Sequence, residues 1–198
     1  MKRTVLLLAI LGLWLPLSGS STLSAQSSGG GWTTLFDGKT LKGWNVVGDA
    51  NWEVVDGVLQ ANKASGNAYL VTPMSYGDFQ LTLDFWVTAD ANSGVFIRCE
   101  DPKDITASNA YEVNIFDTRP DQTYRTGAIV DVAKPASVIM TGGKWNTFDI
   151  TARGSKLTVI LNGVTVVDIT DTKHARGAIA LQYGAGTVKF RNVRVKAS

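Results

Sequence analysis

The chain has very few of the side chains that build metal and nucleophile sites: among its 198 residues there is one cysteine, Cys99, and one histidine, His174. A single cysteine excludes an intrachain disulfide, and one histidine with one cysteine excludes a zinc site of the usual spacing. A serine–histidine nucleophile would have to use His174. The sequence also lacks a phosphate-binding loop and a dinucleotide fingerprint. We therefore predict no cofactor, with calcium left open through Asp and carbonyl oxygens although no dense acidic loop is present.

The N-terminus predicts an exported protein. Lys2 and Arg3 precede an apolar run over residues 4–17, and a small residue, Ala25, ends the segment. The run falls short of the roughly 20 residues of a membrane-spanning helix, so we expect a signal peptide over 1–25 that is cleaved after Ala25. A retained membrane anchor is the alternative. The expected location is periplasmic or secreted, with no membrane partner once the signal is removed.

The rest of the chain has no excess charge of either sign. Cleavage removes Lys2 and Arg3 from the 19 basic residues and none of the 17 acidic ones, so 17 of each remain. This balance gives no electrostatic reason to expect nucleic acid or an anionic membrane as a partner. Residues 26–31, rich in Ser and Gly, predict a flexible linker, and residues 32–198 predict a single domain.

Long stretches of helical periodicity are absent as well, and strand patterns take their place. Residues 79–87 alternate apolar and polar side chains, which predicts a long central strand with one face in the core. Residues 156–161 and 164–169 flank Asn162-Gly163, a pair typical of a tight hairpin turn, and Asp56-Gly57 marks a second hairpin. The pattern indicates an all-β protein.

The last strand requires an irregularity. Val188 and Phe190 share one parity, whereas Val193 and Val195 share the other, so a regular strand cannot bury all four. We predict a β-bulge near Arg191-Asn192. Many short strands with 20 glycines fit two stacked sheets, a sandwich or jelly roll, better than a small barrel.

Two segments carry polar groups on one strand face. Phe96 and Arg98 share a face, and so do Glu112 and Asn114, with apolar residues behind them. If the two strands pair, Arg98 and Glu112 lie side by side among aromatic rings, which suits the C–H faces and hydroxyls of a sugar. An ordinary exposed ion pair is the alternative. Cys99 continues the alternation of Val95 and Ile97, which predicts a buried apolar role rather than a reactive thiol.

The chain resembles a known family along most of its length. Its segment 32–44 (WTTLFDGKTLKGW) is similar to the opening signature of the 3-keto-disaccharide hydrolase family, formerly DUF1080, and further similarity lies at 92–98, 111–117, 126–129, 145–146, 162–163, 177–182 and 190–192. The resemblance implies a concanavalin A-like jelly roll, export, and action on glycosides oxidised at C3. This chain has Asn114 where members often show Gln, and Tyr183 where Asp or His is frequent.

The implied substrate suggests roles for the polar residues. A ketone at C3 makes the C2 proton acidic, so cleavage needs a base, a group facing the enolate and an acid for the leaving group. Our hypothesis makes Glu112 the base and Arg98 the group facing the enolate, with Asp117 or Tyr111 as the acid. The residues expected to contact the carbohydrate are Asn114, Phe96, Gln182 and Trp86.

Three other functions stay open. A lectin-like binding module would use the same groove without cleaving the glycan, because this fold hosts both activities. The segment Glu112 to Asp117 is also similar to the E-x-D-x-x-E motif of laminarinase-like retaining glycosidases, with Asn and Asp at its second and third positions. A purely structural interaction domain would present no groove at these residues.

Overall fold

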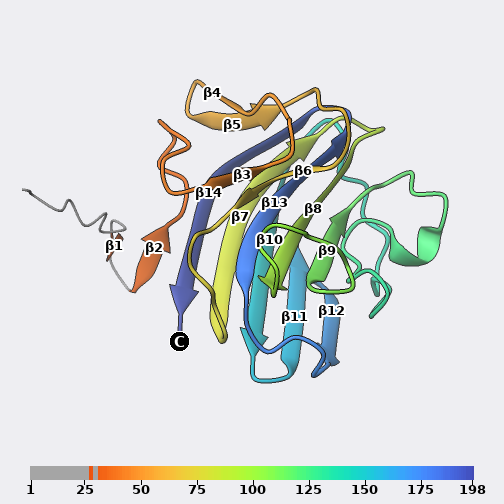
Figure 1. Ribbon diagram of the computed structural model, residues 1–198. Helices are drawn as coiled ribbons and strands as arrows, with labels where there is room; N and C mark the ends of the chain where they lie inside the picture. The colour runs from red at the N-terminus through yellow and green to blue at the C-terminus, as the bar shows by residue number, and fades with distance from the viewer. Residues whose placement is uncertain (1–26, 29–30) are drawn as a thin grey trace, which may run out of the picture.

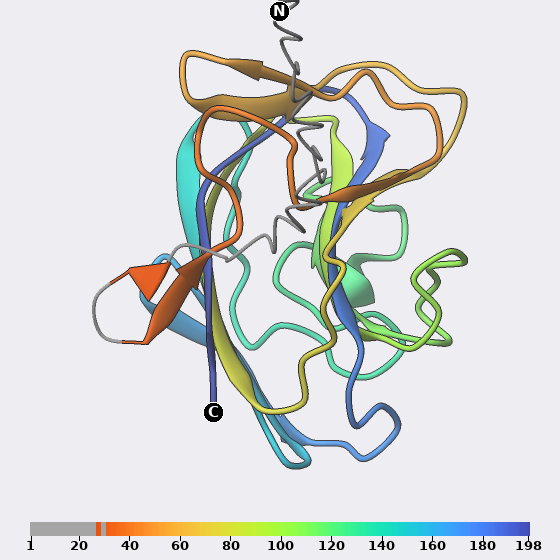
Figure 2. The ribbon, with the colours of Figure 1, turned by 60° about the vertical axis from the view of Figure 1, so that its left-hand side comes forward.

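The computed structural model describes residues 27–28 and 31–198, which form two stacked antiparallel sheets with a single short 3-10 helix, η1 (Gln122–Tyr124) (Figures 1 and 2). The predicted signal peptide and residues 26, 29 and 30 of the predicted linker lie outside the described residues. The nine-stranded sheet has the order β1-β2-β14-β7-β10-β11-β12, and β5 pairs with β14 and with β4. Its strands are β1 (Ser27–Ser28), β2 (Trp32–Thr34), β4 (Glu53–Val55), β5 (Val58–Ala61), β7 (Phe79–Val87), β10 (Trp145–Arg153), β11 (Lys156–Leu161), β12 (Val164–Thr170) and β14 (Val188–Ala197).

The second sheet has five strands in the order β3-β6-β13-β8-β9. They are β3 (Asn45–Val47), β6 (Ala68–Val71), β13 (Ala178–Ala185), β8 (Asn92–Cys99) and β9 (Tyr111–Ile115). The predicted all-β jelly roll of two stacked antiparallel sheets is confirmed. Within the described part of the chain, no helix has the length and apolar character needed to cross a membrane.

The strand expected to be central is central. β7 lies between β14 and β10, and its side chains alternate between buried and partly exposed along all nine residues. The alternation places Phe79, Leu81, Leu83, Phe85 and Val87 between the sheets and leaves the residues between them on the outer face.

Turn chemistry and the predicted bulge are also confirmed. Asn162 and Gly163 have φ values of 51° and 81°, the positive angles of a tight hairpin turn between β11 and β12. The pairing of β14 with β7 shifts register between Arg191 and Arg194, with Asn192 at φ 55°. The shift changes the parity, so the four apolar residues on either side of it all face the core: Val188, Phe190, Val193 and Val195.

The apolar core lies between the sheets, and a second, smaller cluster lies on the outer face of the five-stranded sheet. The second cluster gathers Phe96, Tyr69 and Cys99 under Ile105, from the loop between β8 and β9. Cys99 is buried as predicted, and burial raises the pKa of its thiol to about 12, which excludes the reactive alternative at neutral pH. It packs on the outer side of the sheet, however, and not beside Ile97 in the main core.

Candidate functional site

Gly94 is the centre of a polar patch on the outer face of the five-stranded sheet. It pairs with Gln182 of β13 on one side and with Asn114 of β9 on the other. A Cβ at Gly94 would lie 3.2 Å from Gln182 Oε1 and 3.4 Å from Glu112 Oε1, so both side chains lean over the bare glycine backbone. We call Gly94, Glu112, Asn114, Gln182 and Tyr69 the Gly94 site. A glycine inside a strand commonly marks a place where another group approaches the backbone closely.

Strand alternation puts these groups on one face. Glu112 and Asn114 are two residues apart on β9. Tyr111, which precedes Glu112, and Val113, which lies between the two, are in the main core. Tyr69 lies directly opposite Gln182 on β6. The predicted split between Glu112 and Asn114 outside and apolar residues inside is therefore confirmed.

Glu112 is a carboxyl group whose proton affinity suits acid–base chemistry at neutral pH. Burial raises its pKa to about 7; the charge of Arg119 opposes the shift and that of Asp131 adds to it. A carboxylate at its ordinary pKa is too weak a base to take a proton from carbon efficiently, whereas one near 7 combines partial ionisation with useful basicity.

Asn114 and Gln182 each have a side-chain oxygen that lacks a hydrogen-bond partner among the described residues. The Asn114 amide donates from Nδ2 to the Tyr124 carbonyl at 2.5 Å, and the Gln182 side chain hydrogen-bonds the Tyr69 hydroxyl. Both amides are thereby fixed by one end, while Asn114 Oδ1 and Gln182 Oε1 are buried and have no hydrogen-bond partner in the described structure. A buried unpaired acceptor costs about 1–3 kcal/mol, so each of these two oxygens has unused capacity to accept a hydrogen bond from a water molecule or a ligand.

The geometry defines what the site can do. A titratable carboxyl and two unpartnered amide oxygens converge over a strand glycine, an arrangement that accepts hydrogen bonds from several hydroxyls of one ligand. No group of three His, Cys, Asp or Glu side chains lies close enough to ligate a metal ion within the described residues.

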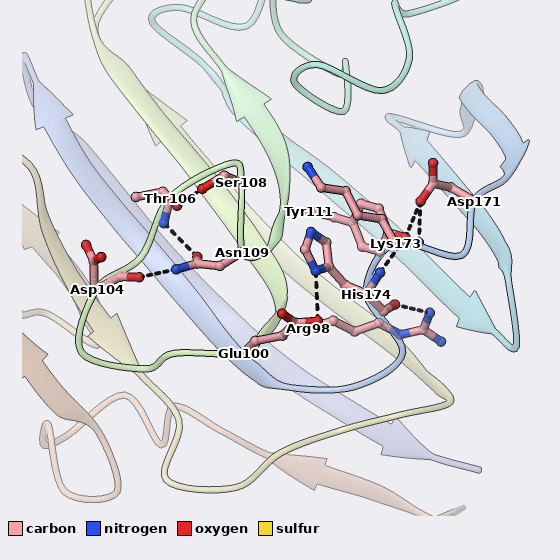
Figure 3. A network of polar contacts seen from close by, with 10 residues as sticks. All are labelled: Arg98, Glu100, Asp104, Thr106, Ser108, Asn109, Tyr111, Asp171, Lys173 and His174. Carbon is pink, nitrogen blue, oxygen red and sulfur yellow. Dashed lines mark hydrogen bonds and ion pairs between the residues drawn. The ribbon is translucent and has the colours of Figure 1, made fainter.

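Arg98 does not lie beside Glu112, contrary to our prediction. Its φ of 54° and the register shift between β13 and β8 form a bulge that breaks the expected alternation. The guanidinium, 1% exposed, donates to the carbonyls of Gly77 and His174 at 3.0 Å each and forms an ion pair with Asp78 at 3.4 Å. Figure 3 shows it reaching the backbone of His174. Arg98 therefore joins two chain segments and is not a substrate group.

The two proposed acids are also elsewhere. Tyr111 precedes Glu112 directly, so its ring points to the opposite face and is packed in the main core. Its hydroxyl donates to Asp171 at 2.5 Å and accepts from the His174 backbone N–H (Figure 3). Burial, followed by this bond to Asp171, raises the pKa of the Tyr111 hydroxyl.

Asp117 is buried and fully engaged. Its carboxylate accepts hydrogen bonds from the Thr126 hydroxyl at 2.6 Å, from the N–H and hydroxyl of Thr141 at 2.6 and 3.0 Å, and from the Gly142 N–H at 3.0 Å. Asp117 thereby fixes two places in the segment between β9 and β10, one at Thr126 and one at Thr141 and Gly142. Because Asp117 is committed in this way, the carboxylate pair that a laminarinase-like mechanism requires does not form.

The predicted aromatic contacts are only partly in place. Phe96 pairs with Glu112 on the correct face, but its ring is 2% exposed and packs edge-on against Tyr69 at 5.5 Å. The Phe96 ring therefore packs against the Tyr69 ring of the site and has no exposed face on which a sugar could stack. Trp86 lies on the other sheet, where it pairs with Trp145, so it is not part of the Gly94 site.

The cation that acts on Glu112 is Arg119, which the sequence did not single out. Arg119 and Asp131 lie in the segment between β9 and β10. Part of that segment runs along the open edge of β9, where the Val130 N–H donates to the Glu112 carbonyl at 3.0 Å and Asn114 N–H to the Ala128 carbonyl at 3.0 Å. Strand periodicity carries no information about such a loop.

The two stacked antiparallel sheets define a β-sandwich protein. The chain belongs to the family of the 3-keto-alpha-glucoside-1,2-lyase-like domain, whose profile matches residues 31–196. The family resemblance noted in the sequence is therefore confirmed, and the family is one of carbohydrate-active proteins.

Individual relatives agree with this family. A 3-keto-disaccharide hydrolase of Bacteroides thetaiotaomicron is 28% identical over 82 residues, covering 36% of this chain and 28% of that protein, so the match spans less than a third of the relative. Two structures of proposed glycosyl hydrolases from Parabacteroides distasonis superpose with TM-scores of 0.74 and 0.70, at 22% and 27% identity. They cover 85% and 84% of this chain and 94% and 99% of theirs.

A binding module shares the fold too. The carbohydrate-binding module CBM66 from Bacillus subtilis superposes with a TM-score of 0.63 at 20% identity, over 78% of this chain and 96% of the module. At that identity the similarity shows the fold alone.

Proposed function

We propose that the protein cleaves the glycosidic bond of 3-keto-glycosides, with Glu112 as the base that removes the C2 proton. The observation that carries this proposal is the juxtaposition over Gly94 of a carboxyl with a pKa of about 7 and two buried, unpartnered amide oxygens. The family assignment and the named Bacteroides relative support the substrate class. We further propose that the protein acts after export, in the periplasm or outside the cell.

The first step transfers a proton. The C2–H bond breaks, Glu112 takes the proton, and the electron pair forms an enolate between C2 and C3. Arg119, whose charge acts on Glu112, replaces Arg98 as the cation that faces the developing negative charge. Asn114 Oδ1 and Gln182 Oε1 accept hydrogen bonds from sugar hydroxyls and fix the ring with C2 toward Glu112.

The second step expels the leaving group. The enolate pair forms the C1=C2 double bond, the C3 ketone is restored, and the C1–O bond breaks. Because Tyr111 and Asp117 are committed elsewhere, the departing oxygen takes its proton from water or from the newly protonated Glu112. Addition of water across C1=C2 then completes net hydrolysis, and omission of this step leaves the elimination product.

The test is a mass-spectrometric assay of the purified full chain with a 3-keto-disaccharide and with its unoxidised parent. We expect release from the oxidised sugar only, and a fall of about 10²–10⁴-fold in Glu112→Gln, which keeps the shape of the side chain but not its basicity. Glu53→Gln, a change at an exposed carboxylate on the other sheet, is the matched control and should act as the parent. Release from both sugars, or full activity of Glu112→Gln, would contradict the proposal.

A lectin-like module is the second candidate, favoured by the structural similarity to a carbohydrate-binding module. In that case the Gly94 site binds a glycan through the same amide oxygens without cleaving it. A binding site has no need of a carboxyl with a raised pKa, which is why the enzyme is our first choice. Glycan binding without release from any 3-keto-sugar would reverse this order.

A further inference from the structure

A hollow of about 380 Å³ lies on the outer face of the nine-stranded sheet. Six of the residues that line it are Thr34, Phe36, Thr82, Asp84, Thr147 and Arg194. Thr82 and Asp84 alternate along β7 with the core residues Leu81, Leu83 and Phe85, so the hollow faces away from the core and from the other sheet. We call it the Asp84 hollow.

The β14 bulge shapes this hollow. Arg191 and Arg194 are three residues apart and would point to opposite faces of a regular strand. The register shift and the positive φ of Asn192 between them put both arginines on the outer face, opposite Asp84 and Thr82 respectively. Asn192 and Val193, the residues at the bulge, line the hollow themselves.

The polar groups of the hollow are fixed, and some are unused. Asp84 accepts hydrogen bonds from Thr147 Oγ1 at 2.8 Å, Arg191 Nε at 3.1 Å and Asn192 Nδ2 at 2.7 Å. Burial raises the pKa of Asp84, but these bonds outweigh it and the net shift is downward. In contrast, the hydroxyls of Thr34 and Thr82 form no hydrogen bond with any described residue.

Three partly exposed tryptophans lie on the same outer face of the sheet as the hollow, although none of them lines it. Trp86 and Trp145 are paired across β7 and β10, one step along from Asp84 and Thr147, and Trp32 lies under Arg194 on the other side. Each ring carries a cation: Lys189 at 4.9 Å over Trp86, Arg191 at 3.9 Å over Trp145, and Arg194 at 5.2 Å over Trp32. The rings hold the cations in place, so little side-chain freedom is lost when they donate to a ligand.

We propose that the Asp84 hollow is a second saccharide-binding site, which takes a neutral sugar unit of a glycan. Threonine hydroxyls, the Asp84 carboxylate, the Asn192 amide and the Arg194 guanidinium line the hollow, and aromatic rings lie nearby on the same face. This mixture recognises sugar hydroxyls and C–H faces. Arg191 neutralises Asp84, so the hollow presents no unmatched negative charge for a cation. The groups that remain unused are the hydroxyls of Thr34 and Thr82, which suit the hydroxyls of a neutral sugar.

This site is separate from the Gly94 site and does not depend on the proposed cleavage. Stacked sheets lie about 10 Å apart before side chains are counted, so one sugar ring cannot reach both outer faces. Figure 2 shows the two layers, with β14, β7 and β10 in one and β13 and β8 in the other. Binding of a glycan at the Asp84 hollow would raise the effective concentration of that glycan's ends near the Gly94 site.

The test is titration of the full chain with the neutral trisaccharides maltotriose, cellotriose and laminaritriose, followed by the indole N–H signals of the tryptophans in NMR spectra. We expect at least one of them to shift the signals of Trp32, Trp86 and Trp145 and to leave those of the buried Trp44 and Trp52 unchanged. The double variant Thr34→Val, Thr82→Val should weaken binding about tenfold or more, since it removes both free hydroxyls without changing side-chain shape.

Thr151→Val is the matched control, because Thr151 lies on the same outer face of β10 but does not line the hollow. Glu112→Gln should bind the trisaccharide as the parent does. The proposal is overturned if no neutral trisaccharide shifts the three signals, if the double variant binds equally well, or if Glu112→Gln abolishes binding. Tighter binding of trigalacturonate than of every neutral sugar would overturn the assignment of ligand class.

Discussion

Gly94→Ala tests whether the bare strand at the centre of the Gly94 site is required by a ligand. Gly94 has no positive φ, so alanine fits its backbone and gains about 0.5–1 kcal/mol through reduced freedom of the unfolded chain. The new Cβ would lie 3.2 Å from Gln182 Oε1, close enough to displace it by a few tenths of an ångström. These effects oppose each other, so we expect a change in the free energy of unfolding within about 1 kcal/mol.

The effect on function should be much larger, because the methyl group occupies the floor between Glu112 and Gln182. Misplacement of reacting groups on the ångström scale costs about 10²-fold, so kcat/KM on a 3-keto-disaccharide should fall by roughly 10–100-fold. Gly66→Ala is the control, since a Cβ there would meet nothing within 4 Å and φ is not positive. Equal activity of Gly94→Ala and the parent, with both folded by circular dichroism, would refute the placement of the ligand at this strand.

Three further predictions concern stability. Asp117→Asn should lower the free energy of unfolding by about 2–4 kcal/mol in urea titrations, because one carboxylate oxygen becomes an NH2 group that cannot accept a hydrogen bond. Either the two backbone N–H groups of Thr141 and Gly142 or the two threonine hydroxyls then lose their acceptor, and an unchanged midpoint would contradict the anchoring role of Asp117. Replacing Asn162-Gly163 by Val-Val should cost about 3 kcal/mol, since both positions have positive φ, and a melting temperature equal to the parent's would remove that requirement. Glu112 has a pKa of about 7 in the folded protein against an ordinary 4.5, so its contribution to the free energy of unfolding is full below about pH 4.5 and is lost as the pH rises through 7. After a discount for partial exposure, Glu112→Gln should be more stable than the parent at pH 8 by on the order of 2 kcal/mol. Identical pH profiles of stability for the two proteins would argue against the raised pKa.

Local periodicity was sufficient to predict much of the fold. The alternation of β7, the positive φ values of Asn162-Gly163 and the parity conflict in β14 are all properties of a few neighbouring residues. The same alternation placed Glu112 and Asn114 on one face of β9 and Tyr111 on the other, although Tyr111 was also assigned as an acid. Parity alone excludes that second assignment.

The errors arose where backbone irregularity or strand order decides the outcome. The apolar residues around Arg98 fit a regular alternation, unlike those around Asn192, so nothing in the sequence reveals the bulge at Arg98. Regular alternation therefore predicted Glu112 as the neighbour of Arg98, whereas the side chain contacts Gly77, Asp78 and His174. Trp86 was expected to face outward and does, but the sequence could not tell which of two sheets β7 belongs to. Arg119 lies in a loop whose path depends on the buried bonds of Asp117, which join residues up to 25 positions apart.

The most direct test of the central claim is the pH dependence of kcat/KM for release of the sugar from a 3-keto-disaccharide. If Glu112 is the base, the rate should rise tenfold per pH unit on the acid side and level off above a pKa of about 7, because only the ionised carboxylate accepts the C2 proton. Glu112→Gln should have a much lower kcat/KM, without the tenfold rise per pH unit on the acid side. A parent profile that is flat between pH 5 and 8, or a Glu112→Gln variant with the same limb at about 7, would show that another group removes the proton.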